Sequence, residues 1–338
     1  MAESAAVKVD ARRVSLPSGA PPLYTDMPPW LGHDGSYAIA ELDVDAPRGP
    51  WAVIEASTGR AHIGRRLPQI WGALLDADGP PLLGTSGGVI EVALSGPSIV
   101  RELREGVGRG PDDAETDFLR LGERHVLLGA VGKQTAKLLD LDRWAVARSQ
   151  LPVSPPWVAL GGSPRRVWSL PRGEVVTLDA SYKITERRAA PAAIAATGSA
   201  SALFALVGRL HPHRGTGWVH ALGRDVLPSR LRQRLSSPLD DVELCRLDPQ
   251  TLRVRARRAL GGLAKVVEAG LGTVLSDHER WTTAMMHRCF TTDSVGRPIL
   301  LAGDRLVVLD QETLDPTIDT GLADDRSVHN WTSRNGLS

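Results

Sequence analysis

The sequence predicts an all-β protein, a six-bladed β-propeller with two elaborated loops on one face. Three observations favour this fold. A unit of two short strands occurs six times, a second two-stranded unit precedes each copy, and tryptophans recur at intervals of about forty residues. Four short strands per repeat are typical of a propeller blade, because one four-stranded sheet cannot bury both of its faces until neighbours pack against it.

The first unit is a hairpin whose second strand ends in basic residues. Each copy has an apolar strand, an Asp or small residue, and a turn of three or four residues before the second strand. The copies are WAVIEASTGRAHIGRRL from Trp51, VIEVALSGPSIVREL from Val89, AKLLDLDRWAVARSQL from Ala136, VVTLDASYKITERRA from Val175, VELCRLDPQTLRVRARRA from Val242 and RLVVLDQETLDPTI from Arg305.

The second unit has an apolar strand, a turn and another apolar strand, in three copies after a Pro. Trp30 and Trp71 are 41 residues apart, and Trp71 and Trp157 are 86 apart, which is twice 43. Helical repeats need amphipathic helices of about ten or more residues, and these runs are shorter. The copies begin at Pro28, Pro68, Phe118, Pro155, Ala192 and Met286.

We expect an N-terminal segment over residues 1–26, the propeller over 27–322 and a C-terminal tail over 323–338. Residues 7–15 (VKVDARRVS) are expected to add to an outer edge or to help close the ring. The tail is too short for a seventh blade. Seven blades remain the alternative, in case one of the two insertions described below contains a blade.

Composition excludes several classes of function. Forty basic and thirty-nine acidic residues give a net charge of +1, so no nucleic-acid partner is expected. Nowhere do about eighteen apolar residues run together, and the first residues do not form an export signal, so we expect no membrane partner and a cytoplasmic location. Arginine far outnumbers lysine, which suggests a GC-rich, bacterial genome. Cys245 and Cys289 are interpreted as buried or idle thiols.

The stretch Leu-Asp-Pro-x-Thr-Leu-x-Val from Leu247, with its degenerate copies, resembles the outer hairpins of the YVTN and quinoprotein-like β-propellers. The resemblance covers residues 27–320 and implies the fold. It implies no function, because this superfold includes enzymes, ligand binders and docking platforms. The Gly-His and Trp-Asp marks that recur in WD40 blades are absent as a repeated pattern. Asn330 and Asn335 are the only asparagines, so the axial calcium site of lactonase-like propellers is not transferred.

Two insertions interrupt the repeat pattern. If the strands of a blade are lettered A to D from the axis outward, residues 209–241 lie between B and C of the fifth blade. Residues 263–287 lie between its D strand and the next A strand. Connections of these two kinds leave a propeller on the same face. Long loops in a compact domain usually have a function, so this face is the predicted functional site.

The insertions contain five of the nine histidines. We predict His211, His213, His278 and Glu279 as candidate catalytic residues, and a shared lid that brings His211 or His213 towards Asp277, His278 or Glu279. Histidines in solvent are the alternative. A metal site formed by these histidines with Asp277, Glu279 and Cys289 is a further alternative. The sequence has no HExxH motif or paired CxxC motif, so we assign no metal, and the cofactor stays unassigned. His220 and His287 are assigned to ligand binding.

Trp30, Trp71 and Trp157 are the other predicted ligand-binding residues. They share one repeat position at the start of the innermost strands and should lie around the axial mouth. Two interpretations stay open: packing between blades, or an aromatic funnel for an apolar or planar ligand. A set of arginines ends the outer strands and is expected to protect sheet edges. These are Arg65, Arg66, Arg187, Arg188, Arg255, Arg257 and Arg258.

The predicted function is therefore binding of a small-molecule ligand or a protein partner at the funnel on the elaborated face. The alternative is a propeller enzyme, a lyase, hydrolase or cyclase, that uses the loop His, Asp and Glu residues on the same face. The sequence has no Walker A motif and no GxGxxG at the start of a helix. Gly-Thr-Ser-Gly-Gly at Gly84 lacks the strand-to-helix setting of a nucleophile elbow.

Overall fold

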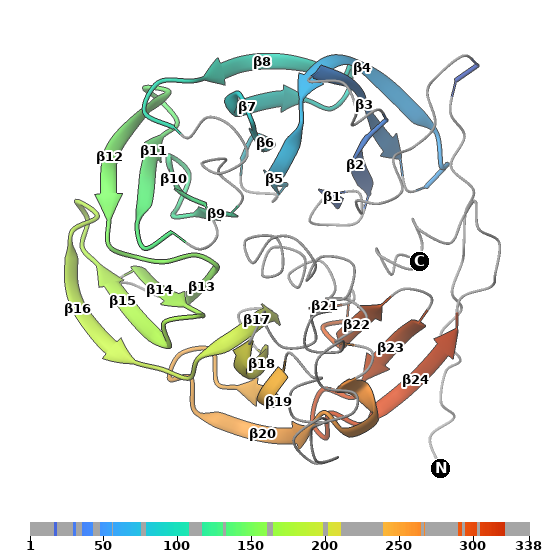
Figure 1. Cartoon of the computed structure of the whole chain (residues 1–338), viewed down its shortest axis with the longest axis vertical. Helices are drawn as coiled ribbons and strands as arrows, with labels where there is room; N and C mark the ends of the chain where they lie inside the picture. Colours follow the sequence, from blue (N-terminus) through green and yellow to red (C-terminus); the bar gives the residue numbers. More distant parts are fainter. Residues whose placement is uncertain are drawn as a thin grey trace, which may run out of the picture.

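The computed structural model contains six four-stranded antiparallel sheets, arranged as blades around a central axis (Figure 1). The predicted six-bladed β-propeller is confirmed, since the described residues form six sheets and not seven. The described residues are 17–18, 30–31, 36–42, 48–55, 57–75, 79–107, 117–130, 133–160, 165–198, 202–210, 239–264, 267, 290–292, 295–302 and 305–321.

Each blade is one continuous stretch of chain, and its strands pair in chain order from the axis to the rim (Figure 1). All six predicted hairpins form the two outer strands of a blade. In blades 1 to 3 the strands are β1 (Trp30–Leu31), β2 (Tyr37–Glu41), β3 (Arg48–Glu55), β4 (Ala61–Pro68), β5 (Ile70–Leu74), β6 (Leu82–Thr85), β7 (Gly88–Ala93), β8 (Ser98–Leu103), β9 (Asp117–Arg120), β10 (His125–Gly129), β11 (Ala136–Asp140) and β12 (Ala145–Leu151).

The described strands run from Trp30 to Gly321, and the domain boundaries themselves stay predictions. The predicted closing segment 7–15 and the tail 323–338 lie outside the described residues. In blades 4 to 6 the strands are β13 (Trp157–Leu160), β14 (Arg165–Ser169), β15 (Glu174–Leu178), β16 (Ile184–Ala189), β17 (Ala193–Gly198), β18 (Leu203–Leu210), β19 (Leu239–Leu247), β20 (Val254–Ala259), β21 (Phe290–Thr292), β22 (Pro298–Ala302), β23 (Arg305–Leu309) and β24 (Pro316–Gly321).

The strands change in character from the interior to the rim. Middle strands such as β10 and β15 are nearly continuous apolar runs, because they lie between two strands and between two blades. Outer strands such as β16 and β20 have one free edge and are largely exposed and charged. Charges at a free edge oppose pairing with another sheet. The arginines predicted to protect edges do lie on these outer strands, β4, β16 and β20.

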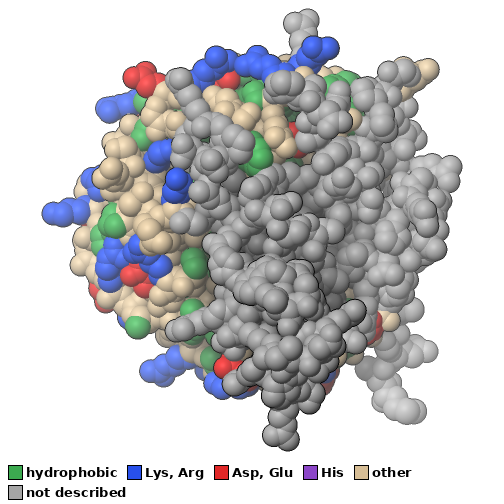
Figure 2. All heavy atoms as spheres, in the orientation of Figure 1, with side chains coloured by type: hydrophobic (Ala, Val, Ile, Leu, Met, Phe, Trp, Pro, Cys, Tyr) green, Lys and Arg blue, Asp and Glu red, His purple; other side chains and the backbone are tan. Residues whose placement is uncertain are grey.

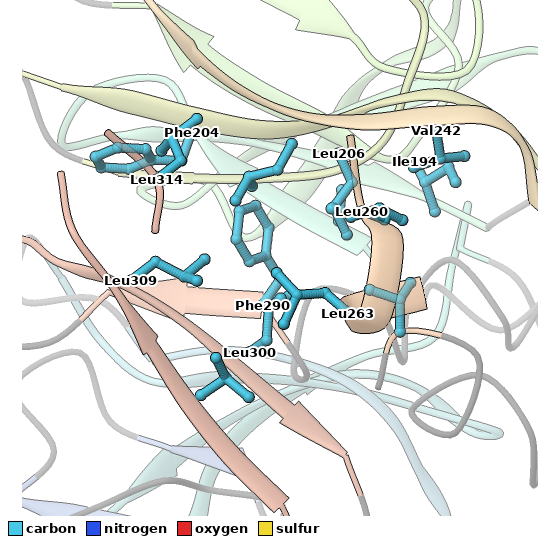
Figure 3. Packing of buried hydrophobic residues seen from close by; sticks show 14 of the residues in the cluster. Ile194, Phe204, Leu206, Val242, Leu260, Leu263, Phe290, Leu300, Leu309 and Leu314 are labelled. Atoms are coloured by element: carbon cyan, nitrogen blue, oxygen red, sulfur yellow. The ribbon is translucent and has the colours of Figure 1, made fainter. Parts of the chain in front are cut away.

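Apolar side chains from neighbouring blades form the core between them. Between blades 5 and 6, for example, Phe204 of β18 packs in one cluster with Phe290 of β21 and Leu314 (Figure 3). Clusters of the same kind join blade 1 to 2, 2 to 3, 3 to 4 and 4 to 5. Burial of this apolar surface is the main source of stability in such a ring, because a single blade cannot bury its faces alone.

The outer hairpins of blades 3 to 6 share one turn. An Asp at the start of each turn accepts hydrogen bonds from backbone N–H groups that follow it, and the pKa of each carboxyl is lowered. Three or four residues after the Asp, a large side chain with positive φ packs against the core between two blades. Only Gly adopts this backbone conformation at low cost. The large residues at this position are Trp144 (φ 49°), Tyr182 (φ 59°), Leu252 (φ 57°) and Leu314 (φ 61°).

Arginines link all four of these turns to the preceding blade. In each case one guanidinium group donates a hydrogen bond to a backbone carbonyl of the turn, so the bond joins two blades. The pairs are Arg101 with Leu141 (3.0 Å), Arg148 with Tyr182 (3.0 Å), Arg166 with Gln250 (2.7 Å) and Arg258 with Leu314 (3.3 Å).

Candidate functional site

Both long connections leave the ring on the face where the innermost strands begin. One joins β18 to β19, and the other joins β20 to β21. Because strands alternate in direction within a blade, the ends of the second and fourth strands lie on the same side as the start of the first. The two interruptions are thus of the kinds predicted, between the second and third strands and between two blades.

The boundaries of both insertions differ from the prediction. Strand β18 extends to Leu210, which pairs with Leu239, so the connection is shorter than expected. The ladder continues because Gly208, with φ 146°, forms a bulge in which a Cβ would lie 2.8 Å from the Cα of Val242. Leu263 ends a short 3-10 helix (η1, Gly261–Leu263) and is buried in the core between blades 5 and 6, so it belongs to the ring.

The predicted loop residues lie outside the described residues. They are His211, His213, His220, Asp277, His278, Glu279 and His287. Their roles, and the lid that they were expected to form, stay predictions.

The three tryptophans do occupy the predicted repeat position. Trp30 and Trp157 are the first residues of β1 and β13, and Trp71 is the second residue of β5. These are innermost strands (Figure 1). Trp71 and Trp157 are only 8% and 3% exposed, and Trp30 packs against the core between blades 1 and 2. The Trp157 ring covers Gly129 of blade 3, where a Cβ would lie 2.5 Å from Cη2.

The described residues form no cluster of aromatic rings at the axis. Trp157 belongs to the apolar cluster between blades 3 and 4, and the aromatic contact seen in the described part, His125 with Tyr182, lies at the other end of the blades. A large aromatic side chain stabilises a propeller more when it fills a gap between two blades than when it faces solvent. Packing between blades is therefore the interpretation that fits Trp71 and Trp157.

Asp117 takes the tryptophan position in blade 3, as the first residue of β9. Its Oδ1 accepts a hydrogen bond from the N–H of Phe118 at 3.1 Å, and the backbone N–H of Trp157 also binds the carboxyl group. Its Oδ2 has less than 1 Å² of accessible surface and no hydrogen-bond partner among the described residues. The residue as a whole is partly exposed, although this oxygen is covered.

Burial raises the pKa of Asp117 to about 7, against the opposing effect of the two backbone N–H groups. The strands that face β9 from the neighbouring blades, β5 (IWGAL) and β13 (WVAL), carry no ionisable side chain. Arg120 and His125 lie at the opposite end of β9 and β10. The described surroundings thus supply hydrogen bonds to the carboxylate but no positive charge, and near neutral pH the group can either accept or donate a proton.

Sequence reasoning missed Asp117, although a signal was present. The innermost strand of blade 3 was identified from Phe118 onward as the copy without a tryptophan. A carboxyl group at a position that is otherwise apolar and aromatic is the feature that marks Asp117.

A second polar cluster joins blades 3 and 4 at the opposite face. The Tyr182 hydroxyl lies 2.9 Å from Nδ1 of His125 and 3.3 Å from the carbonyl oxygen of Leu121, while Nε2 of His125 lies 4.0 Å from Asp140. The Arg165 guanidinium stacks 4.8 Å from the centroid of the Tyr182 ring. Burial raises the pKa of Tyr182, so the phenol stays protonated and the cluster acts as a hydrogen-bonded joint between blades.

Within the described ranges, no group of three or more His, Cys, Asp and Glu residues is arranged to hold a metal ion. Cys245 is buried, and burial raises the pKa of its thiol to about 11, which fits the predicted idle thiol. Cys289 lies outside the described residues. No helix in the described part of the chain is long and apolar enough to cross a membrane.

Basic side chains occur at several places on the described part of the visible face. Figure 2 shows Lys and Arg side chains spread around the rim of the described part, in several places beside Asp or Glu. Two examples from the outer strands are Arg187 with Glu174 at 2.7 Å and Arg255 with Asp248 at 2.6 Å.

No family model and no curated protein matches the sequence. Solved structures match over most of its length. The WD40 domain of Neurospora crassa Pan2 has a TM-score of 0.50 and 12% identity, over 90% of this chain and 80% of that chain. The U3-55K structure has a TM-score of 0.52 and 9% identity, over 92% and 85%. A Bacteroides uniformis protein provisionally assigned as a 6-phosphogluconolactonase has a TM-score of 0.51 and 11% identity, over 87% and 85%.

Identities this low show the fold alone. The WD40 likeness lies in the architecture, since the sequence has no Trp-Asp and has Gly-His only once, at Gly32-His33, so neither mark recurs from blade to blade. By fold the chain is a β-propeller, similar to WD40 domains and to other propellers.

Proposed function

We propose that this chain is a binding propeller whose small-molecule ligand or protein partner docks at the axial mouth, on the face where the innermost strands begin. The β-propeller is a fold that commonly binds proteins. The observation that carries the proposal is Oδ2 of Asp117. A buried polar atom without a partner costs free energy, so its retention points to a ligand that supplies the missing hydrogen bond.

Two further features support this face. Nε1 of Trp157 is also buried without a hydrogen-bond partner in the described part, so two polar groups of adjacent blades are unsatisfied near one seam. Both long connections leave on the same side. We therefore retain the loop residues as candidates for contacts to the bound molecule, with His211, His213, His278 and Glu279 as the polar set and His220 and His287 beside them.

The proposal is tested by comparing variants of the two faces. A library of metabolites and short peptides is screened for compounds that raise the melting temperature of the wild type. Compounds that bind the axial mouth should lose their effect in Asp117→Asn and in the double variant His211→Ala, His278→Ala. They should keep it in Tyr182→Phe, the matched control on the opposite face. Compounds that respond only to Tyr182→Phe would show that the binding face is the other one.

A second candidate function is catalysis at the same mouth. The pKa of Asp117, about 7, is the observation that favours it, because a general acid or base works best when its pKa lies near the ambient pH. A lyase, hydrolase or cyclase of this kind needs a second titratable group, for which His211 and His278 are the candidates. Turnover that survives in Asp117→Asn would exclude this role.

A further inference from the structure

The unsatisfied carboxyl group also indicates what kind of molecule the axial mouth binds. We propose that Asp117 binds an organic cation, a guanidinium or ammonium group, presented either by a small amine or by an Arg or Lys side chain of a partner. This inference rests on the proposed function and adds the chemistry of the ligand.

The described residues already supply hydrogen-bond donors to the Asp117 carboxyl group. The N–H groups of Phe118 and Trp157 bind the carboxyl group, and hydrogen bonds from N–H groups stabilise the charged form of a carboxylate over the neutral form. A neutral carboxyl group accepts such hydrogen bonds more weakly, so these donors favour the carboxylate. The second oxygen, Oδ2, remains unpaired among the described residues.

The missing half is a positive charge. The facing strands β5 and β13 carry no ionisable residue. Apart from Asp117 itself, strands β9 and β10 carry two ionisable residues, Arg120 and His125, and both lie at the far end of those strands. Burial without a counter-ion keeps the pKa of Asp117 near 7. A bound cation would lower that pKa and recover the free energy that burial of the charge costs.

An organic cation fits better than a metal ion. A zinc-type site needs at least three protein ligands, and the described residues contain no such group. A guanidinium or ammonium group needs one carboxylate and a few further acceptors. Binding should then be linked to the loss of a proton from Asp117, so affinity rises as the pH rises through 7.

Four probes test the proposal by isothermal titration calorimetry with the full chain. Agmatine represents a free amine, and acetyl-Ala-Arg-Ala-amide represents an arginine of a partner. Each is paired with a neutral control, N-carbamoylputrescine acetylated on its amine for the first and the citrulline peptide for the second. One or both cations should bind the wild type about tenfold more tightly at pH 8.5 than at pH 6, because the ionised fraction of Asp117 rises from about a tenth to nearly all. Which of the two binds identifies the source of the cation.

Asp117→Asn is the decisive variant, because an amide keeps an oxygen for the Phe118 N–H but carries no charge. It should lose at least about tenfold in affinity at pH 8.5 and lose the pH dependence. Its melting temperature, measured in parallel, reports whether it is folded, and Asp117→Glu, which keeps the charge, should retain part of the binding.

Several results would overturn the proposal: no binding of either cation to the wild type at pH 8.5, equal binding of the neutral controls, or equal binding to Asp117→Asn. The proposed function has its own test. A neutral compound that stabilises the wild type and loses its effect in Asp117→Asn would keep the axial site and reject the cation. If no compound loses its stabilising effect in Asp117→Asn or in the double variant His211→Ala, His278→Ala, both the proposed function and the cation site are rejected.

Discussion

The guanidinium carbon of Arg101 lies 4.2 Å from the centroid of the Trp144 ring, and the two residues belong to different blades. Arg101 projects from β8 of blade 2, and Trp144 occupies the positive-φ position in the turn of blade 3. The same guanidinium donates to Oε2 of Glu91 at 2.6 Å and to the carbonyl oxygen of Leu141 at 3.0 Å. One side chain therefore joins a carboxylate of its own blade to the backbone and ring of the next.

Replacing Arg101 with alanine should destabilise the propeller by about 2 kcal/mol, because it removes the cation–π contact and two charge-assisted hydrogen bonds and leaves Glu91, which is 13% exposed, without its partner. Urea unfolding at pH 7 measures the change. Arg143→Ala is the control, because the Arg143 side chain is 83% exposed and its ion pair with Asp140 is long at 3.8 Å. A loss no larger than that of the control would show that the link between blades contributes nothing.

Leu314 tests the positive-φ position of the turns. Its side chain is fully buried between blades 5 and 6 at φ 61°. Leu314→Ala should cost about 3 kcal/mol, and Leu314→Gly about 1 kcal/mol less, because glycine relieves the left-handed backbone that alanine retains. Leu309, equally buried in strand β23, should show the reverse order. Equal costs for Gly and Ala at position 314 would argue against backbone strain there.

Tyr182→Phe should cost about 1 kcal/mol, because it removes the hydroxyl that lies 2.9 Å from His125 and 3.3 Å from the Leu121 carbonyl. A double-mutant cycle with His125→Ala, followed by chemical denaturation, measures the coupling between blades 3 and 4. Strictly additive effects would mean that the two side chains do not stabilise each other.

Asp117 should make stability depend on pH in a direction opposite to that of most carboxylates. Its pKa is raised in the folded state to about 7, so the folded chain holds a proton that the unfolded chain releases near pH 4. The stabilising contribution is therefore complete below about pH 4 and is lost as the pH rises to 7.

Thermal unfolding of wild type and Asp117→Asn between pH 4 and 8.5 measures this effect. The variant should gain in melting temperature relative to the wild type as the pH rises, and the gain should level off above about pH 8. The difference between the two proteins isolates this residue, because the turn carboxylates Asp140, Asp179 and Asp310, whose pKa values are lowered, titrate in both. A constant difference across the range would contradict the raised pKa.

The sequence determined the architecture to the level of the blade. Short apolar runs, turn residues and a period of about forty residues are local features, so they predicted the strands and the number of blades. They also located Trp30, Trp71 and Trp157 on innermost strands. The packing at the seam between two blades could not be predicted from these local features.

Only the tertiary structure decided what the residues at those seams do. Periodicity placed the tryptophans near the axis, but the close approach of blade 3, where Gly129 leaves room, turned the Trp157 ring into the gap between blades. His125 and Tyr182 are 57 residues apart and meet only because their blades are neighbours in the ring. Asp117 has a buried carboxyl oxygen, Oδ2, without a partner among the described residues, and no facing strand offers its carboxyl group a charge. Such environments depend on which surfaces the ring brings together, and a repeat pattern contains no record of them.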